Sequence, residues 1–371
     1  MEEKVKKRIL IITPGPKYNL SNAFEDRCFN LSKLFCGTIL TSSPIKTKVR
    51  YSDFLIDCVK DPFGKSLFST VGFIYLALRY LMAARATQKY DIVVTYDPLK
   101  TGLIGLLVAK LTGTRLVVEV NGDYTSDWNY AEIKSPFKRA FKKKAMLFVE
   151  KLVLKNADGV KLLYENQVDF FKPLAKPIVR VFPDYVNGSR FINYRENKEI
   201  LFAGFPMYVK GLDLLVEAFS RISDLYPDWT LKILGYYPNA SELRDLIGDK
   251  KNIFHHLPVD PDLMPHHIGH CGIFVLPSRT EAMGRVLVES MAAGKPRLGS
   301  DVGGIPTVIN DKVDGLLFES ENVEDLANKL GMLMSDARLR EKLGLNAAQR
   351  YQSEFQPSVY FEKLANFYNS I

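Results

Sequence analysis

Short β-branched apolar segments alternate along the chain with longer segments whose apolar residues recur at helical spacing. In the first half, this pattern predicts strands at residues 9–12, 91–95, 115–120 and 159–163, with helices at residues 24–35, 67–86 and 102–111. Strands that alternate with helices are typical of a parallel sheet covered on both faces. The first half is therefore predicted to be a doubly wound α/β domain.

The pattern is interrupted between residues 179 and 197, which are rich in Pro, Asn, Gly and Arg. A second alternation then predicts strands at residues 199–203, 230–234, 252–255, 272–276 and 296–300, helices at residues 211–222, 240–247, 324–334 and 337–352, and a helix from Glu281 or Gly284 to Ala293. We predict an N-terminal Rossmann-like domain over residues 1–190 and a C-terminal one over residues 191–354, facing each other across a cleft. Ligands of such sheets bind beyond the carboxyl ends of the strands, so the loops after strands are candidate sites.

Composition narrows the choice of partners and compartment. The 371 residues carry a net charge of +8, which predicts an anionic partner: a phosphorylated ligand, nucleic acid or an acidic membrane surface. The four cysteines form no C-x-x-C pair, which argues against a zinc knuckle or a disulfide framework and fits a reducing compartment. The apolar run at residues 9–12 is too short for a secretory signal, and no uncharged apolar run reaches transmembrane length, so we expect a cytoplasmic protein.

Two acidic residues stand out in T-E-A-M-G-R-V-L-V-E-S-M-A-A-G, residues 280–294. The second half of this segment is apolar on nearly every side and is expected to be buried, yet Glu289 lies in the middle of it. A ribose diol would offer two hydroxyl donors to that carboxylate; the alternative is an ion pair with a lysine or arginine of a neighbouring element. Glu281 follows a predicted strand and is placed to accept hydrogen bonds from hydroxyls, with the Met283 and Gly284 amides as donors.

A second candidate loop, A-G-F-P-M-Y-V-K-G-L-D-L-L, begins where the strand at residues 199–203 ends. Gly204 allows the backbone to turn close to a ligand. Lys210 stands just before an amphipathic helix, where the ammonium charge and the helix dipole together favour a diphosphate. The alternative is a surface lysine at a helix start. The sequence S-D-V-G-G-I-P, residues 300–306, also places two glycines after a strand.

The N-terminal half carries less specific patterns. The sequence T-P-G-P, residues 13–16, follows the first predicted strand but does not match G-x-G-x-x-G, so the dinucleotide-binding fingerprint is absent there. Another predicted strand ends in Asn121, Gly122 and Asp123, and we expect these residues to face the cleft.

Taken together, these motifs resemble those of the retaining GT-B glycosyltransferases of family 4 over most of the chain. The most specific is E-x7-E, Glu281 to Glu289, within P-S-R-T-E-A-M-G-R-V-L-V-E-S-M-A-A-G-K-P. The stretch G-F-P-M-Y-V-K-G-L-D-L-L-V-E-A-F resembles the family's glycine-to-lysine loop, and S-D-V-G-G-I-P-T-V-I-N-D-K-V-D-G-L-L-F resembles the segment that follows. Y-D-P-L-K-T-G-L-I-G and V-V-E-V-N-G resemble the N-terminal half more loosely. The fold implied is GT-B, with two Rossmann-like α/β domains.

The resemblance implies a retaining, metal-independent transfer from a nucleotide-sugar donor to a glycan or lipid-linked acceptor in polysaccharide or glycolipid assembly, with no cofactor. Glu289 would bind the donor ribose, Glu281 the hydroxyls of the donor sugar and Lys210 the diphosphate, which makes Glu281 and Lys210 the catalytic pair. Further donor contacts would come from Gly15, Gly204, Val259, Met283 and Gly284. The last helix, residues 355–371, would pack back on the N-terminal domain.

The resemblance also places Asn121 and Asp123 on the acceptor side. Three positions depart from the family pattern, one of them Thr307, which stands where a glutamate is common after G-G-I-P. Phe205 stands where an arginine is common, and Asn121 stands where a histidine is common. Arg279 or Arg285 would supply the missing positive charge. These departures leave a catalytically weak or inactive scaffold protein as an alternative function. A nucleotide-sugar epimerase on the same fold is a third, which the E-x7-E spacing disfavours.

A basic segment, residues 134–155, carries eight Lys or Arg and one Glu. Its apolar residues Phe137, Phe141, Ala145, Phe148 and Leu152 share one helical face. Such a helix docks on anionic lipid, with Lys142, Lys143 and Lys144 as the membrane contact; the alternative is that the apolar face packs in the core and the lysines are solvated. We expect peripheral association with the inner face of the membrane, and no nucleic-acid binding, because no base-reading motif accompanies the charge.

All five histidines lie between residues 255 and 270. His266 and His270 are spaced i, i+4, as in some metal sites, but no acid lies between them as in H-E-x-x-H. We therefore expect them to be structural and expect no metal.

Overall fold

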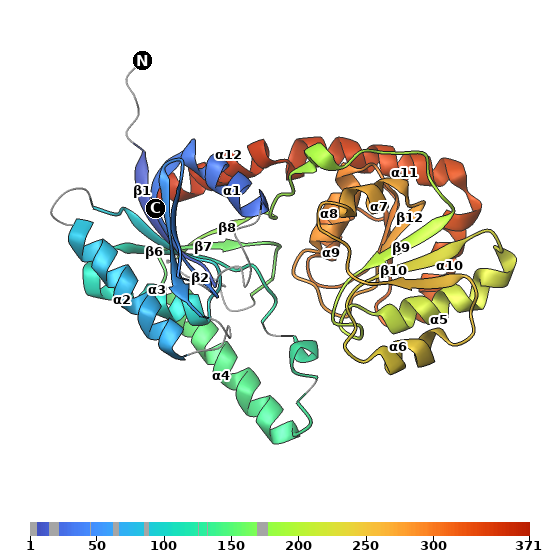
Figure 1. Ribbon diagram of the computed structural model, residues 1–371, viewed down its shortest axis with the longest axis horizontal. Coiled ribbons are helices and arrows are strands. Elements are labelled where there is room, and N and C mark those ends of the chain that lie inside the picture. Colours follow the sequence, from blue (N-terminus) through green and yellow to red (C-terminus); the bar gives the residue numbers. More distant parts are fainter. Residues whose placement is uncertain are drawn as a thin grey trace, which may run out of the picture. The chain divides into compact units, whose positions relative to one another are not determined.

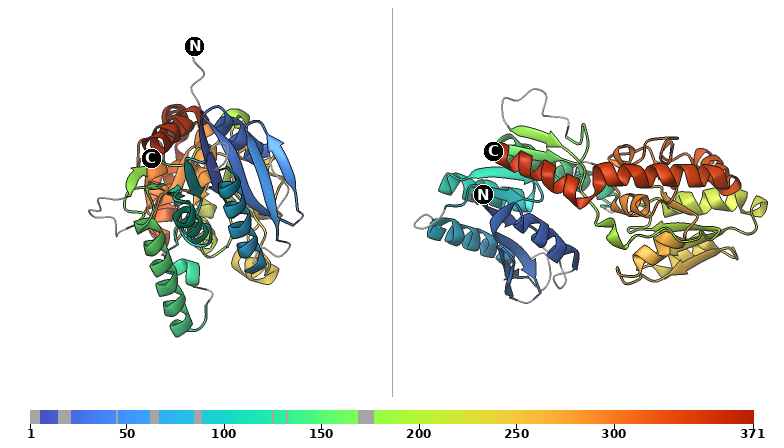
Figure 2. Two further views of the ribbon diagram at one scale, coloured as in Figure 1. Left: turned by 90° about the vertical axis from the view of Figure 1, so that its left-hand side faces the viewer. Right: turned by 90° about the horizontal axis from the view of Figure 1, so that it is seen from above.

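The computed structural model describes residues 6–14, 22–44, 46–61, 67–84, 89–124, 126–131, 133–168 and 177–371. The chain divides into two compact units, of which the first contains the residues up to Phe182 together with Phe361–Ile371. The second unit is Pro183–Tyr360. Each unit is a sheet flanked by helices, as the alternation of strands and helices predicts, and Figures 1 and 2 show each of them from several directions.

The described strands of the first unit form one sheet in the order β3-β4-β2-β1-β5-β6-β7-β8. Their bounds are β1 Lys7–Ile12, β2 Phe35–Ser43, β3 Lys48–Tyr51, β4 Phe54–Lys60, β5 Ile92–Thr95, β6 Arg115–Glu119, β7 Gly159–Leu162 and β8 Ile178–Val181. All neighbouring pairs are parallel except β3 with β4. The central strands β1 and β5 are runs of Ile, Leu and Val that helices bury on both faces, as parallel sheets require.

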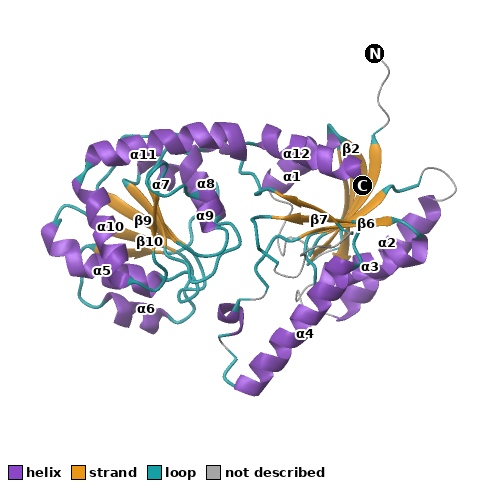
Figure 3. Ribbon diagram, turned by 180° about the vertical axis from the view of Figure 1, so that it is seen from behind, coloured by secondary structure: helices purple, strands orange, loops and turns teal. Residues whose placement is uncertain are grey.

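Helices cover the two faces of this sheet unequally. The described helices are α1 Asn22–Ser32, α2 Leu67–Ala84, α3 Lys100–Thr112, α4 Pro136–Lys155 and the C-terminal part of α12 Pro357–Ser370. Figure 3 shows α2, α3 and α4 on one face, with α1 and α12 on the other. The hydroxyl of Tyr368 in α12 donates a 2.5 Å hydrogen bond to Glu119 at the end of β6, and this bond holds the C-terminal segment on the first unit.

The second unit has a six-stranded parallel sheet among its described residues, in the order β11-β10-β9-β12-β13-β14. The strands are β9 Glu199–Ala203, β10 Thr230–Leu234, β11 Ile253–His256, β12 Ile273–Leu276, β13 Arg297–Ser300 and β14 Leu316–Phe318. The helices are α5 Leu212–Ile222, α6 Ala240–Ile247, α7 Met264–His270, α8 Arg285–Ala292, α9 Ile305–Val308, α10 Val323–Ser335 and α11 Ala337–Arg350. A π-helical turn at Tyr351–Phe355 separates α11 from α12.

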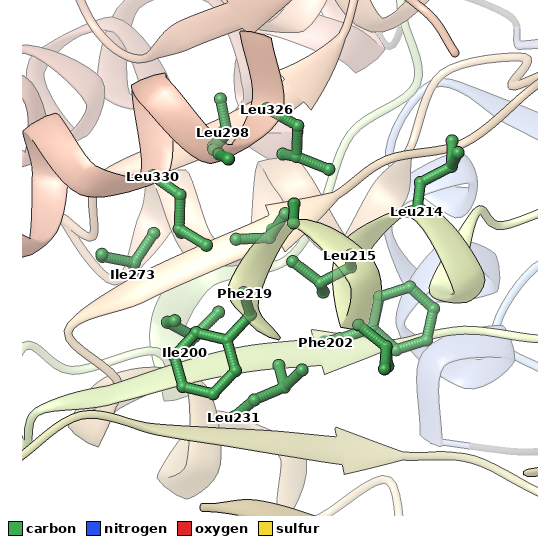
Figure 4. Packing of buried hydrophobic residues seen from close by; sticks show 14 of the residues in the cluster. Ile200, Phe202, Leu214, Leu215, Phe219, Leu231, Ile273, Leu298, Leu326 and Leu330 are labelled. Atoms are coloured by element: carbon green, nitrogen blue, oxygen red, sulfur yellow. The ribbon is translucent and has the colours of Figure 1, made fainter. Parts of the chain in front are cut away.

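A continuous apolar core lies between the sheet of the second unit and helices α5 and α10 (Figure 4). Phe219 of α5 and Leu330 of α10 pack with Ile200 and Leu231 of the sheet, and all four are fully buried. Full burial of each such side chain stabilises the fold by about 1.5–3 kcal/mol. This core fixes the strands whose carboxyl ends carry the candidate site.

Two details of the sequence prediction are wrong. The helix predicted for residues 24–35 ends at Ser32, and Phe35 begins strand β2, because residues 33–34 form a turn. The sequence did not predict strands β2, β3, β4, β8 and β14: the apolar residues of the first four mix with polar or charged residues, and β14 is only three residues long. No helix in the described ranges is both long enough and apolar enough to cross a bilayer.

Candidate functional site

The loops that follow β9, β12 and β13 meet at the carboxyl edge of the second sheet, where these three strands are neighbours. Two glycines allow this close approach. Gly211 has φ +68°, and a Cβ atom there would lie 1.9 Å from the carbonyl oxygen of Pro277. Gly303 has φ +52°, and a Cβ atom there would lie 2.1 Å from the carbonyl oxygen of Glu281. Any larger residue at either position would therefore force the loops apart.

Lys210 and Glu281 are in direct contact at this edge. The Nζ atom of Lys210 donates a 2.6 Å hydrogen bond to Oε2 of Glu281, and the Ser278 hydroxyl donates to the same oxygen at 3.2 Å. Only 22% and 13% of the two charged side chains are exposed, so the pair is poorly screened by solvent. The structure thus brings together the two residues that the sequence selected from different loops.

Glu289 lies in the second turn of α8 and is partly buried. Among the described residues, no side chain or amide donates a hydrogen bond to its carboxylate and no cation forms an ion pair with it. Burial raises the pKa of Glu289, and the charge of Arg285 one turn earlier offsets part of this rise. The alternative, an ion pair between Glu289 and a lysine or arginine of a neighbouring element, is therefore not present in the described part of the chain. A partly buried carboxylate without a protein partner can accept hydrogen bonds from the hydroxyl groups of a ligand.

The segment between Glu281 and α8 presents backbone donors. Gly284 has φ +78° and directly precedes the helix, whose first amides lack intrahelical partners. Within the described chain, the Met283 and Gly284 amides have no hydrogen-bond acceptor. The Met283 side chain is buried, and its sulfur accepts a hydrogen bond from the Asp184 amide. This segment therefore combines free amides with a helix N-terminus, an arrangement suited to polar or anionic groups.

Gly204 lies against Lys210, while Val259 stands apart from both. A Cβ atom at Gly204 would be 3.1 Å from Cγ of Lys210, and the carbonyl of Gly204 accepts a 2.9 Å hydrogen bond from Tyr237. Val259 follows β11, two strands away from β9 at the same edge. Its backbone N–H and C=O have no partner within the described part of the chain.

Arg279 is a site residue whose role the sequence did not reveal. Its guanidinium makes a two-pronged pair with Asp213 at 2.7 and 2.8 Å, a 2.6 Å contact with Glu321, and a 2.6 Å hydrogen bond to the carbonyl of Tyr208. These contacts tie the Lys210 loop to the Glu281 loop. Arg279 is therefore already engaged with these partners, whereas Arg285 is exposed.

Asn121 and Asp123 belong to the first unit, at the carboxyl end of β6. The side-chain oxygen of Asn121 is buried without a hydrogen-bond partner, and Asp123 accepts a 3.2 Å bond from the Ser126 amide. Glu150 of α4, which the sequence did not single out, is 2% exposed, and burial together with the charge of Asp123 raises its pKa to about 7. Gly15 lies outside the described residues.

The histidines make ring contacts with a neighbouring tyrosine. Tyr194 stacks on His270 at 4.4 Å, and His266 lies 4.2 Å from His270. No group of three His, Cys, Asp or Glu side chains within the described ranges is arranged to hold a metal ion.

Known proteins provide an independent comparison. Residues 190–350 match the family model described as Glycosyl transferases group 1. An uncharacterized glycosyltransferase of Methanocaldococcus jannaschii is 30% identical over 182 residues, 48% of this chain and 48% of the relative, so the chain spans about half the length of that curated relative. The N,N'-diacetylbacillosaminyl-diphospho-undecaprenol alpha-1,3-N-acetylgalactosaminyltransferase of Campylobacter jejuni is 25% identical over 277 residues, 67% of this chain and 68% of the relative.

The fold has a solved counterpart over almost its whole length. HepE of Anabaena, whose crystal structure contains UDP-glucose, superimposes with a TM-score of 0.75 at 15% identity, covering 98% of this chain and 100% of HepE. At this identity the likeness establishes the fold alone. It confirms the predicted GT-B class, two Rossmann-like α/β sheets.

Proposed function

We propose that this chain, a member of the glycosyl transferases group 1 family, is a retaining glycosyltransferase that moves a sugar from a nucleotide-diphosphate donor to a glycan or lipid-linked acceptor. The observation that carries the proposal is the contact between Lys210 and Glu281, together with the unpaired carboxylate of Glu289 eight residues later in α8. These three charged groups correspond to the three parts of a nucleotide-sugar. The Lys210 ammonium suits the diphosphate, the Glu281 carboxylate suits the sugar, and the Glu289 carboxylate suits the ribose.

Glu289 is assigned to the ribose. A vicinal diol presents two hydroxyl donors to one carboxylate and would satisfy the oxygens that the described chain leaves unpaired. The nucleobase would then lie near the free backbone groups of Val259, and Gly204 would leave room for the phosphates beside Lys210. The UDP-glucose bound by HepE makes a uracil nucleotide the first candidate.

Lys210 and Glu281 are assigned to the chemistry. Cleavage of the sugar–phosphate bond builds negative charge on the diphosphate and positive charge on the sugar ring. The Lys210 ammonium and the free amides of Met283 and Gly284 would stabilise the diphosphate and orient the sugar without reorganisation. Glu281 would accept hydrogen bonds from sugar hydroxyls on the face opposite the leaving group. The leaving phosphate itself would take the acceptor proton, so that the acceptor oxygen bonds to the same face from which the phosphate departs.

Asn121 and Asp123 are assigned to the acceptor. The buried, unpartnered oxygen of Asn121 would accept a hydrogen bond from an acceptor hydroxyl. A lipid-linked acceptor is favoured over a free glycan by the name of the Campylobacter jejuni relative, which specifies a diphospho-undecaprenol substrate. Polysaccharide or glycolipid assembly would be the setting.

Helix α4 supports contact with the inner face of the membrane through Lys142, Lys143 and Lys144. Phe137 and Phe141 are 81% and 69% exposed, so the apolar side of this helix is not packed in the core as the alternative required. Replacing the three lysines by glutamine should release the protein from vesicles that contain phosphatidylglycerol. Unchanged sedimentation with those vesicles would remove α4 from the proposal.

Release of nucleoside diphosphate from a panel of nucleotide-sugars, measured without acceptor and with EDTA, tests the function. An active transferase should slowly hydrolyse one donor, and Glu281→Gln should abolish this activity. A scaffold protein that only kept the fold should hydrolyse none. The Glu341→Gln variant provides a control, because Glu341 is an exposed acid of the same unit.

A further inference from the structure

The outward faces of three neighbouring helices in the first unit are apolar. They expose ten large apolar side chains, here called the apolar helix face: Val71, Tyr75, Met82, Leu103, Leu107, Leu111, Phe137, Phe141, Phe148 and Leu152. Within each helix these positions are four or seven residues apart, so they form one stripe per helix. A surface helix normally places charged and polar residues along this line.

The opposite sides of the same helices are already used by the core. Phe73 of α2, Ile104 of α3 and Val153 of α4 pack with Leu10 and Val118 of the sheet in a single buried cluster. The apolar helix face is therefore not part of this core and is not needed to complete it. Helix α3 lies between α2 and α4, and the three run side by side on one face of the sheet (Figures 1 and 3). Their stripes thus form neighbouring parts of one surface, far larger than a scattering of single exposed residues.

The charges on these helices have one sign. Helix α2 contains Arg79, α3 contains Lys100 and Lys110, and α4 contains seven Lys or Arg, while α2 and α3 contain no acid. The only acid of α4, Glu150, is buried. An apolar surface among ten cations, without an exposed acid on the three helices, is complementary to an anionic lipid surface, where apolar side chains enter the acyl boundary and cations meet headgroups.

We propose that the outward faces of α2, α3 and α4 together form a membrane-docking surface, in which the leucines of α3 and the stripe of α2 enter the lipid. This proposal extends the membrane contact of α4 to two further helices, α2 and α3, which carry few of the charges and insert into the lipid. It rests on the proposed function only for its biological setting. The lipid is chosen over a second copy of the chain because the face has no exposed acid to pair with the cations of another copy.

The docking surface also borders the edge that carries the acceptor residues. Helix α3 begins at Lys100, three residues after Asp97, so its first turn lies at the carboxyl end of β5. Asn121 and Asp123 follow β6, the next strand in the sheet. A headgroup held at the bilayer surface would therefore stand beside these residues, and a lipid-linked acceptor would not have to leave the membrane.

Sedimentation with vesicles of phosphatidylcholine, with or without phosphatidylglycerol, tests the proposal. The test variant is Leu107→Gln with Leu111→Gln on α3, since both leucines are exposed and glutamine keeps helix propensity. A second variant, Tyr75→Gln, tests α2. The matched control is Leu225→Gln with Leu345→Gln, two exposed leucines of the second unit.

The wild type and the control should bind vesicles that contain phosphatidylglycerol, and the α3 variant should bind about tenfold more weakly or worse, because each leucine contributes through its buried apolar area. Tyr75→Gln should weaken binding in the same direction. Vesicle binding of both variants equal to the wild type would overturn the proposal and leave α4 as the only contact. The proposal would also be overturned if the wild type is a dimer without lipid and the double variant Leu107→Gln with Leu111→Gln is a monomer. That result would assign the face to a second copy of the chain. Thermal shift by UDP, measured in parallel, reports the donor site separately: its presence in a variant that does not bind vesicles shows an intact fold.

Discussion

The Nζ atom of Lys210 lies 2.6 Å from Oε2 of Glu281, although the two residues are 71 positions apart and follow different strands. The contact depends on two glycines, Gly211 and Gly303, at which a side chain would collide with the backbone of the Glu281 loop. It also depends on Arg279, which joins the two loops through Asp213 and the carbonyl of Tyr208. Close approach of the loop backbones at the two glycines is therefore required for the site, and the charged contacts of Arg279 join the loops further.

Glu281→Gln should lower turnover by about 10²-fold while leaving the donor KM nearly unchanged. The substitution removes a negative charge that faces the sugar as positive charge develops, and effects of this kind are realised mainly in the transition state. Steady-state kinetics with the accepted donor provide the measurement. Wild-type turnover in Glu281→Gln would show that this carboxylate does not act on the reacting sugar.

Lys210→Ala should weaken donor binding and turnover together. The ammonium interacts with the diphosphate both before and during bond cleavage, so its loss affects the ground state and the transition state. Lys251→Ala, an exposed lysine of the same unit, is the control and should change neither. Equal affinity of Lys210→Ala and wild type for the nucleoside diphosphate, by calorimetry, would contradict the diphosphate assignment.

Arg279→Lys should destabilise the second unit by about 1–3 kcal/mol, because lysine cannot reproduce the two-pronged bond to Asp213 and leaves Glu321 without its partner. Urea unfolding followed by circular dichroism measures this change. An unfolding free energy equal to that of the wild type would mean that the loops are joined without the guanidinium.

Glu150→Gln should stabilise the protein at pH 8 and have little effect at pH 4. Burial raises the pKa of Glu150 to about 7 in the folded state, above its usual 4.5, so the folded protein binds the proton more tightly than the unfolded chain. Stability from this group is complete below pH 4.5 and declines as the pH rises to about 7. Glutamine removes that decline, which is worth about 1–3 kcal/mol. The melting temperatures of both proteins are measured between pH 4 and pH 8. A difference between them that stays the same at every pH would contradict the burial of an unpaired carboxyl.

The sequence predicted most strands of the second unit because they are short apolar runs, several of them followed directly by glycine or proline, as Gly204 follows Glu199–Ala203 and Pro277 follows Ile273–Leu276. Strands such as Glu199–Ala203 and Thr230–Leu234 have the predicted bounds. In the first unit, the sequence does not predict β2. Gly37, Thr41 and Ser42 interrupt its apolar pattern, and the helical pattern of the preceding segment continues to Phe35. Both patterns compete locally, and only pairing with β1 and β4 decides between them.

The candidate site was predictable where one loop carries its own chemistry, as for Lys210 and Glu281. Contacts that join separate loops were not predictable. Arg279 is a case in point, since its partners Asp213 and Glu321 are distant in sequence and become neighbours only in the folded unit. In the sequence, Glu150 is only one charge in a basic helix, because its burial depends on the loop that follows β6.

The most direct test of the central claim, a nucleotide site at Glu289, is a thermal-shift measurement with UDP, GDP, ADP and TDP in EDTA on wild type and Glu289→Gln. A ligand at 100 times its Kd stabilises the folded state by about 2.7 kcal/mol, which is readily detected. The account predicts that one nucleotide raises the melting temperature of the wild type and that most of this shift is lost in Glu289→Gln. An equal shift in both proteins, or no shift with any nucleotide, would contradict the assignment of Glu289 to the donor ribose.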